Sequence, residues 1–187
     1  MLRKTLVLTV ALAVIALVMT SCDNSPQQNR SVLSIESLIT EEGFAAPVIS
    51  DVLTNGSVFP DAVTVVFQNR PYSQLIVTAP DRPYGDFEIY KYRVEWESTD
   101  GSTPALPTYE ADMGLTVPSF KSAGASVMIV TWENKANPPL DALVGANQEA
   151  RMNAKITFFG HETGTDRETT IQAQIGVIFA DFADAAP

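Results

Sequence analysis

The chain consists of short apolar segments, rich in β-branched and aromatic residues, that are separated by Gly, Pro, Asn and Asp. Segments of this kind, with no amphipathic helices between them, predict β-strands joined by turns. The expected strands are Val32–Ile39, Val48–Leu53, Ala62–Asn69, Phe87–Glu97, Leu115–Val117, Ser126–Glu133, Glu149–Gly160 and Thr169–Asp181. The pattern therefore predicts an all-β fold, a sandwich or barrel built from antiparallel pairs.

Two patterns predict which side chains are buried. Between residues 87 and 97, Tyr90, Tyr92 and Trp96 alternate with charged residues, so one strand face is expected in the core and the other in water. Trp132 lies in the strongly apolar segment 126–133 and is predicted to be buried as well. Segments 126–133 and 169–181 carry apolar residues on both faces, which predicts central or covered strands.

The last two predicted strands flank a loop with two glycines, residues 160–167, and are expected to form an antiparallel hairpin. Before them, Leu140, Leu143 and Val144 fall on one face of a helical turn between Pro138 and Gly145, which predicts one short helix. A long crossover at this point resembles the link between the two sheets of immunoglobulin-like and fibronectin type III-like domains. The resemblance covers residues 47–181. It implies only the general sandwich architecture, because the chain lacks the paired cysteines of true immunoglobulin domains.

The first 22 residues have the organisation of a secretory signal peptide. Two basic residues, Arg3 and Lys4, precede an apolar run that ends at Met19, and small residues lead to Cys22, the only cysteine of the chain. The final four residues, Met-Thr-Ser-Cys, resemble a bacterial lipobox. That resemblance implies export, cleavage before Cys22 and attachment of lipid to its sulfur.

Two alternatives to the lipoprotein hypothesis are a retained membrane anchor and plain secretion. The apolar run from Leu6 to Met19 is shorter than the roughly 20 residues that a transmembrane helix needs. Plain secretion would leave Cys22 as an unpaired thiol in an exported protein. Lipidation removes this difficulty, and the two or three acyl chains of bacterial lipoproteins give stable anchoring.

The sequence predicts three parts: a lipoprotein signal peptide at 1–21, a lipidated tether at 22–30 and a single β-sandwich domain at 31–187. The tether has no apolar side chain after Cys22, which suits a solvated spacer. We expect the protein in the bacterial cell envelope, anchored to a membrane that faces the periplasm or the exterior. Asp23 resembles the inner-membrane retention signal of enteric bacteria, but the choice of membrane stays open.

The chain is acidic, with a formal net charge of −10. Removal of the leader takes away two basic residues and no acids, so the formal charge of the mature chain becomes about −12. Such a balance argues against binding to nucleic acid or anionic lipid. With a single cysteine there is no intramolecular disulfide, and the hydrophobic core must hold the fold unaided.

Three sets of polar residues are candidates for a catalytic or metal-binding site. His161 is the only histidine and is expected in the last hairpin loop with Glu162 and Asp166, but no second histidine completes a common zinc site. Acidic loops at residues 80–86 and 100–101 suggest calcium, yet they lack EF-hand spacing. Carboxylates for glycoside hydrolysis are available, but the sequence does not mark any as desolvated; they are Glu95, Glu97, Glu110 and Asp112. We therefore expect no enzymatic activity, no metal and no cofactor.

Aromatic residues in predicted loops are the remaining candidates for binding; they are Tyr72, Tyr84, Tyr109 and Phe120. Of these, Tyr84 and Tyr109 are predicted to stack on sugars or to hold a peptide. The favoured function is a non-enzymatic binding or assembly module whose envelope protein partner is engaged by loops or a sheet edge. A carbohydrate- or calcium-binding domain is the alternative, and a hydrolase is a weaker third.

Overall fold

The structure is a computed structural model, and it describes residues 31–41, 43–44, 46–71, 85–99, 101, 104–163 and 168–182. The first strands are β1 (Ser31–Thr40), β2 (Gly43–Phe44), β3 (Val48–Asp51) and β4 (Asp61–Pro71). The middle of the chain forms β5 (Phe87–Ser98), β6 (Tyr109–Val117) and β7 (Ser122–Val130). It continues with α2 (Trp132–Ala136), the 3₁₀ helix η2 (Asp141–Leu143), β8 (Glu149–Glu162) and β9 (Glu168–Ala180). No helix within these ranges is long and apolar enough to cross a membrane.

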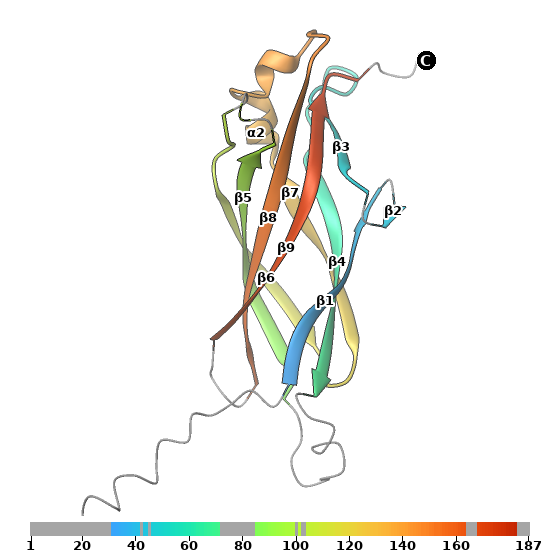
Figure 1. Cartoon of the computed structure of the whole chain (residues 1–187), viewed down its shortest axis with the longest axis vertical. Helices are drawn as coiled ribbons and strands as arrows, with labels where there is room; N and C mark the ends of the chain where they lie inside the picture. The colour runs from blue at the N-terminus through green and yellow to red at the C-terminus, as the bar shows by residue number, and fades with distance from the viewer. Residues whose placement is uncertain are drawn as a thin grey trace, which may run out of the picture.

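The strands form two sheets that pack face to face, so the predicted all-β sandwich is confirmed (Figure 1). One sheet has the order β2-β1-β4-β7 and the other the order β3-β9-β8-β5-β6. The predicted β8–β9 hairpin is also confirmed, and its ladder runs from Glu149–Ala180 to His161–Glu168. One pair departs from the antiparallel expectation, because β3 runs parallel to β9.

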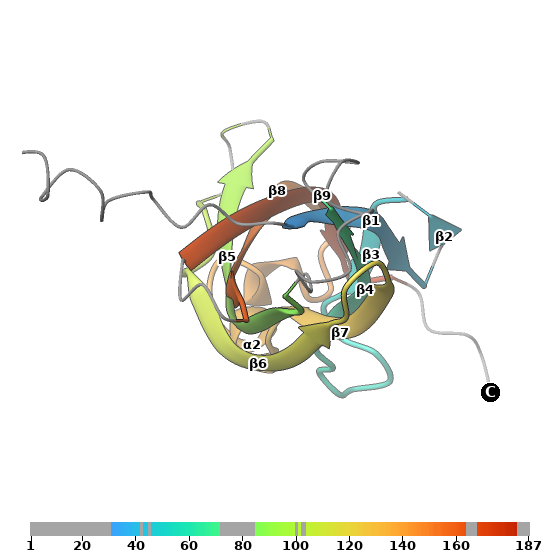
Figure 2. The same ribbon diagram turned by 90° about the horizontal axis from the view of Figure 1, so that it is seen from below.

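The strand order is immunoglobulin-like. In that fold, strands A, B and E lie in one sheet and strands C, F and G in the other. Here β1, β4 and β7 occupy the first set of positions, and β5, β8 and β9 occupy the second. The chain changes sheets between β7 and β8 through α2 and η2, which confirms the predicted helical crossover. Seen end-on, β6 lies next to β7 on one side of the sandwich and β9 next to β1 on the other (Figure 2).

Apolar side chains from both sheets fill the space between them. Phe67 of β4 meets Phe158 of β8 edge-on, with ring centroids 4.9 Å apart, and both are fully buried. Trp96 of β5 packs on Phe179 of β9 at 5.7 Å. Burial of such rings contributes roughly 25 cal/mol per Å² of apolar surface removed from water. This core holds the two sheets together in a chain that has no disulfide.

A bulge in β5 changes which of its aromatic residues are buried. The ladder with β8 shifts register between Ile89 and Lys91, so Tyr90 is an extra residue relative to β8, and the ladder with β6 is also irregular at this point. Beyond the bulge Tyr92 and Trp96 face the core as predicted, but Tyr90 is 40% exposed, so its predicted burial is wrong. A continuous alternation in the sequence predicts burial of Tyr90, whereas the inserted residue reverses the facing of all residues before it.

The prediction for the segment that contains Trp132 is also wrong. β7 ends at Val130, and Trp132 is the first residue of α2, where its side chain is 60% exposed. Thr131 caps the helix: its hydroxyl accepts a hydrogen bond from Asn134 N, and the Asn134 side chain accepts one from Thr131 N. This reciprocal cap starts the helix earlier than expected. β7 is also an edge strand rather than a central one, whereas β9 is central.

The sandwich has two ends, which are named here by their position in Figure 1. The lower end contains the start of β1, the end of β8 and the starts of β5 and β7 (Figure 1). The residues at these points are Ser31, Glu162, Gly85 and Lys121, in the same order. The upper end contains α2, η2, the end of β3 and the start of β6. β1 begins at Ser31, so the described part of the chain starts at the lower end.

Candidate functional site

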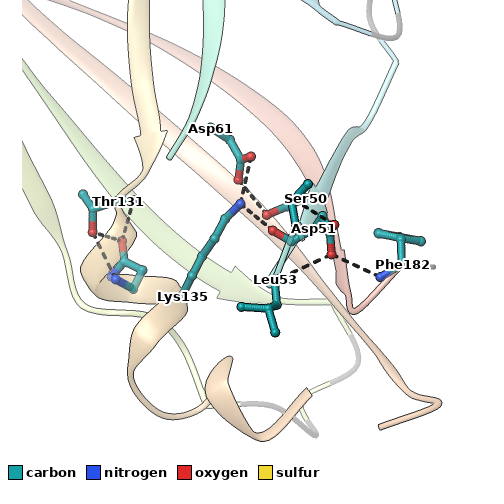
Figure 3. A network of polar contacts seen from close by, with 9 residues as sticks. Ser50, Asp51, Leu53, Asp61, Thr131, Lys135 and Phe182 are labelled. Atoms are coloured by element: carbon teal, nitrogen blue, oxygen red, sulfur yellow. Dashed lines mark hydrogen bonds and ion pairs between the residues drawn. The ribbon is translucent and has the colours of Figure 1, made fainter. Parts of the chain in front are cut away.

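The upper end contains a buried lysine that joins three elements. Lys135 of α2 is 2% exposed, and its Nζ donates to Asp51 O at 2.7 Å and to Asp61 Oδ1 at 3.0 Å (Figure 3). Ser50 Oγ donates to the other oxygen of Asp61 at 2.6 Å. Because Asp51 ends β3 and Asp61 begins β4, the ammonium group ties the helix to both sheets.

The electrostatics of this cluster are those of a structural ion pair. Burial raises the pKa of Asp61, and Lys135 and Ser50 act in the opposite direction without cancelling the desolvation. The Asp51 carboxylate is fully used by the chain itself, since it accepts from Leu53 N, Thr54 Oγ1 and Phe182 N. The cluster therefore positions the loops of the upper end and leaves no acid or base directed at a substrate.

The lower end contains a buried carboxylate that accepts hydrogen bonds from a hydroxyl group and a backbone N–H. Glu162 is 1% exposed, and its Oε1 accepts hydrogen bonds from Ser31 Oγ and Gly85 N, both at 3.1 Å. The Asn69 amide donates to the carbonyls of Gly85 and Val117. These hydrogen bonds connect the first residue of β1 to the ends of β4, β6 and β8.

The predicted cluster around His161 does not form. His161 and Glu162 are consecutive residues of β8 rather than loop residues, so they face opposite sides of the sheet. His161 Nε2 lies 3.7 Å from Glu88 Oε2 on the outer face, whereas Glu162 is buried inside. Asp166 lies outside the described residues. The geometry rules out a shared site of His161 and Glu162, because their side chains cannot converge.

The carboxylates considered for hydrolysis are dispersed on the sheet of β5 and β6. Glu110 pairs with Lys91 at 3.2 Å and with Arg93 at 2.5 Å, and these hydrogen bonds lower its pKa. Glu97 and Asp112 are exposed, and Glu95 is partly exposed. Within the described ranges, no group of three or more His, Cys, Asp or Glu side chains is placed to hold a metal ion.

Of the two predicted binding residues, Tyr109 lines a hollow at the upper end. The hollow measures about 320 Å³ and is bounded by Pro107 and Tyr109 on one side and by Glu133, Asn134 and Pro138 on the other. This volume lies at the small end of the range for ligand pockets. The start of β6 and the helical crossover therefore meet to form a concave surface next to an aromatic ring.

Tyr109 is held in place from behind. Its ring is half-buried and packs edge-on against Tyr92, with centroids 6.1 Å apart. The two hydroxyl groups are hydrogen-bonded to each other, and burial, followed by the Tyr109 interactions, raises the pKa of Tyr92 above its usual range. In the hollow itself, the Asn134 side-chain oxygen is used by the helix cap, and Asn137 donates to Glu133 O at 2.9 Å. The lining thus combines an ordered tyrosine with amide and carboxylate groups.

Two exposed aromatic side chains at the upper end were not predicted as binding residues. Asp61 of β4 pairs with Val130 of β7. Phe59 lies two residues before Asp61 and Trp132 lies two residues after Val130, so both are just beyond this end of the β4–β7 ladder. They are 56% and 60% exposed, the largest values among the exposed large apolar residues of the described ranges. A T-x-x-N capping pattern at residues 131–134 was the signal that could have removed Trp132 from the predicted core.

The remaining predicted site residues are not covered by the structure. Cys22, Tyr72 and Tyr84 lie outside the described residues, as do Asp81 and Asp100. Gly85, which follows Tyr84, lies at the lower end, whereas Tyr109 lies at the upper end. Asp86 accepts a hydrogen bond from Ser119 N at 2.8 Å and so stabilises a turn.

Comparisons with family models and with curated proteins identified no relative of this chain. No protein-family model matches the chain, and no curated protein matches its sequence.

Proposed function

We propose that this protein is a bacterial envelope lipoprotein that is anchored through Cys22 and binds a partner with the upper end of its β-sandwich. The observation that carries the proposal is the separation of two features. The chain from Cys22 enters the domain at Ser31, at the lower end, and the exposed aromatic residues Phe59 and Trp132 and the Tyr109 hollow lie at the upper end.

The dimensions of the domain fit this division. β8 has 14 residues, which corresponds to a length of about 45 Å at the usual rise of a strand. A domain held at Ser31 therefore presents its upper end away from the bilayer. Exposed aromatic residues are over-represented at the centres of protein interfaces, where they account for much of the binding energy. Envelope proteins are the expected partners, because the anchor confines the domain to a membrane surface.

The anchor is tested by isolating the mature protein from membranes and measuring the mass of its N-terminal peptide. We expect a peptide that starts at Cys22 and carries a diacylglyceryl group, with loss of membrane association in a Cys22→Ser variant. A mature protein with an unmodified Cys22 thiol in the aqueous fraction would refute the lipoprotein proposal.

The binding end is tested by photo-crosslinking in intact cells. A photoreactive phenylalanine analogue in place of Trp132 is expected to capture a defined envelope protein. The matched control is the same analogue in place of Gln174, an exposed residue on the outer face of β9. Trp132→Ala should reduce capture from a second site in the hollow by about tenfold or more if this residue is a binding hot spot. Equal crosslinking at both positions would refute a specific upper-end interface.

The lining of the hollow favours carbohydrate as a second candidate ligand. An aromatic ring beside amide and carboxylate groups offers both an apolar surface and the donors and acceptors that hydroxyl groups require. A glycan screen with the soluble mature domain, repeated with Tyr109→Ala, tests this possibility. A hit that survives the substitution would exclude the Tyr109 hollow as the sugar site.

A further inference from the structure

The outer edge of β7 lacks the features that usually protect an edge strand. β7 pairs with β4 on one side, and among the described residues no strand pairs with it on the other. Its nine residues, Ser122–Val130, include no charged residue and no proline. Its register with β4 is regular from Ser122 to Met128. Edge strands are normally shielded by charged side chains, prolines or bulges, because their backbone groups can pair with another chain. The edge of β7 is therefore open to pairing with an added strand.

β6 borders the same side of the sandwich but belongs to the other sheet (Figure 2). The side chains that β6 turns toward the core are only partly buried, namely Ala111, Met113 and Leu115. In the middle of that sheet, inward-facing side chains of β8, such as Ile156 and Phe158, are fully buried. The seam between β6 and β7 therefore leaves apolar surface that a further strand would remove from water.

The Tyr109 hollow lies where the β6–β7 seam reaches the upper end. Its lining comes from the start of β6, at Thr108 and Tyr109, and from the residues that follow β7, including Thr131 and Glu133. The distance from Ser126 to Thr131 along an extended chain is about 17 Å, so a strand of about six residues covers it. A segment that runs along β7 toward α2 would therefore place a side chain in the hollow.

Two carboxylates beside this path have no partner cation among the described residues. Asp112 of β6 is exposed and Glu133 lines the hollow, and neither forms an ion pair with a described Lys, Arg or His. Glu110, by contrast, is paired with Lys91 and Arg93. The chain as a whole is also acidic. Charge complementarity therefore favours a segment that carries basic residues.

We infer that the partner contributes an extended, basic segment that adds to the edge of β7 as a further strand and places one side chain in the Tyr109 hollow. This inference rests on the proposed binding of a partner at the upper end. In strand addition of this kind, main-chain hydrogen bonds supply affinity and alternate side chains supply specificity. Apolar side chains on one face of the segment cover the partly buried residues of β6, and its basic side chains lie near Asp112 and Glu133.

Photo-crosslinking from β7 in intact cells tests the strand addition. The photoreactive phenylalanine analogue replaces Gly124 or Ser126, which are exposed and two residues apart on β7. A Cβ at Gly124 makes only ordinary contacts, so the position accepts a side chain. In an added strand, residues two apart on β7 lie opposite residues two apart on the partner. We therefore expect both positions to capture the protein that is captured from position 132, at sites two residues apart in one segment of that protein.

The spacing of the crosslinks, rather than capture itself, supports the inference. Crosslinks from positions 124 and 126 that fall in separate segments of the captured protein would overturn it, because a partner that docks through a folded surface does not follow the register of a strand.

Charge substitutions on β7 test the basic character of the segment. Ser126→Lys should reduce capture from position 132 by about tenfold, because it adds a like charge and shields the edge. Ser126→Glu is the matched variant and should retain at least about half of the capture, because its carboxylate attracts the basic segment. Thr170→Lys, at an exposed position of β9, is the control for an added charge and should leave capture unchanged. Equal loss for the two Ser126 variants, or no loss for Ser126→Lys, would overturn the inference.

The thermal midpoint of each variant checks its fold, and it should stay within about 2 °C of that of the unsubstituted protein. If Ser126→Lys lowers the midpoint further, the spacing of the crosslinks from positions 124 and 126 decides the inference by itself. Absence of capture from position 132 would refute the proposed function and this inference with it. Capture from position 132 without capture from positions 124 and 126 would refute only the strand addition.

Discussion

The upper and lower ends of the sandwich both contain a buried charged residue, and the described contacts of that residue differ between the two ends. At the upper end, the Lys135 ammonium is paired with the Asp61 carboxylate and a backbone carbonyl. At the lower end, the Glu162 carboxylate accepts hydrogen bonds from a hydroxyl and a backbone N–H. α2, which carries Lys135, is the only α-helix among the described residues. The Lys135 side chain therefore connects this crossover to both sheets.

The lower end also contains close approaches of the backbone. A Cβ on Gly85 would lie 2.5 Å from the Glu162 side chain, and a Cβ on Gly160 would lie 2.5 Å from Glu88 O. Gly160 sits opposite the β5 bulge, where Tyr90 is the extra residue. The comparison indicates that substitutions affect the two ends by different mechanisms: loss of a charge partner at the upper end and steric overlap at the lower end.

The largest effect is expected from removal of the lysine. Lys135→Met keeps the length of the side chain but leaves the Asp61 carboxylate and Asp51 O without their cation, which should lower the free energy of unfolding by about 3 kcal/mol. The matched control is Asp61→Asn. Its cost should be smaller, about 2 kcal/mol, because the amide oxygen still accepts a hydrogen bond from the Lys135 ammonium and because burial already penalises the charge of Asp61, as its raised pKa indicates. Urea denaturation measures the free energy of unfolding of both variants. Equal losses would contradict the expected difference between removal of the lysine and removal of the carboxylate charge.

Steric overlap at the lower end should give a smaller but clear loss. Gly160→Ala forces the β5 backbone at Glu88 to move, and the free energy of unfolding should fall by about 2 kcal/mol. Gly114→Ala is the control, since nothing lies within 4 Å of a Cβ at that edge-strand position. Its stability should change by less than about 0.5 kcal/mol. If both variants lose equal stability in urea denaturation, close approach at Gly160 is not the cause.

Replacement of the lower carboxylate tests whether its charge matters. Glu162→Gln retains one acceptor oxygen for Ser31 Oγ and Gly85 N, so we expect a loss of about 1 kcal/mol in the free energy of unfolding. Ser31→Ala provides a check, because it removes one of the two donors without adding bulk. A loss for Glu162→Gln as large as that for Lys135→Met would show that the stability of both ends depends on charge. The expected difference between the two ends would then be refuted.

The smallest effect is a pH dependence at the upper end. Because the pKa of Asp61 is higher in the folded than in the unfolded chain, the folded state binds its proton more tightly. The stabilisation from this proton is present below the unfolded value near 3.8 and is lost as pH rises through the folded pKa. The difference in unfolding free energy between the natural protein and Asp61→Asn should therefore decrease over this range. A difference that increases with pH would mean that the ion pair outweighs burial.

The sequence predicted the fold class because strand segments are local patterns. Alternation and β-branched composition located most strands, and the final hairpin followed from its glycine-containing loop. β6 was predicted only from Leu115, although it begins at Tyr109, because small and acidic residues interrupt its apolar pattern. Tyr109 was selected as a loop aromatic, and the structure places it at the start of this strand, next to the hollow.

The candidate site at the upper end was only partly predictable. The sequence identified Tyr109, but the hollow also needs Asn134 and Pro138 from a crossover that is 25 or more residues away in the chain. The exposed Trp132 was assigned to the core because it follows an apolar segment. A tryptophan is buried or exposed according to whether another element covers it, and local sequence does not contain that information.

By itself, the sequence determined the β-rich pattern, the absence of a disulfide and the prediction of a lipid anchor at Cys22, because each depends on residues adjacent in the chain or on composition. Only the tertiary structure decided that Tyr90 faces outward, that His161 and Glu162 point apart, and that the turn containing Phe120 lies at the end of the sandwich where β1 begins. These three results depend on a bulge, on strand facing and on register, which are set by contacts between segments distant in the sequence.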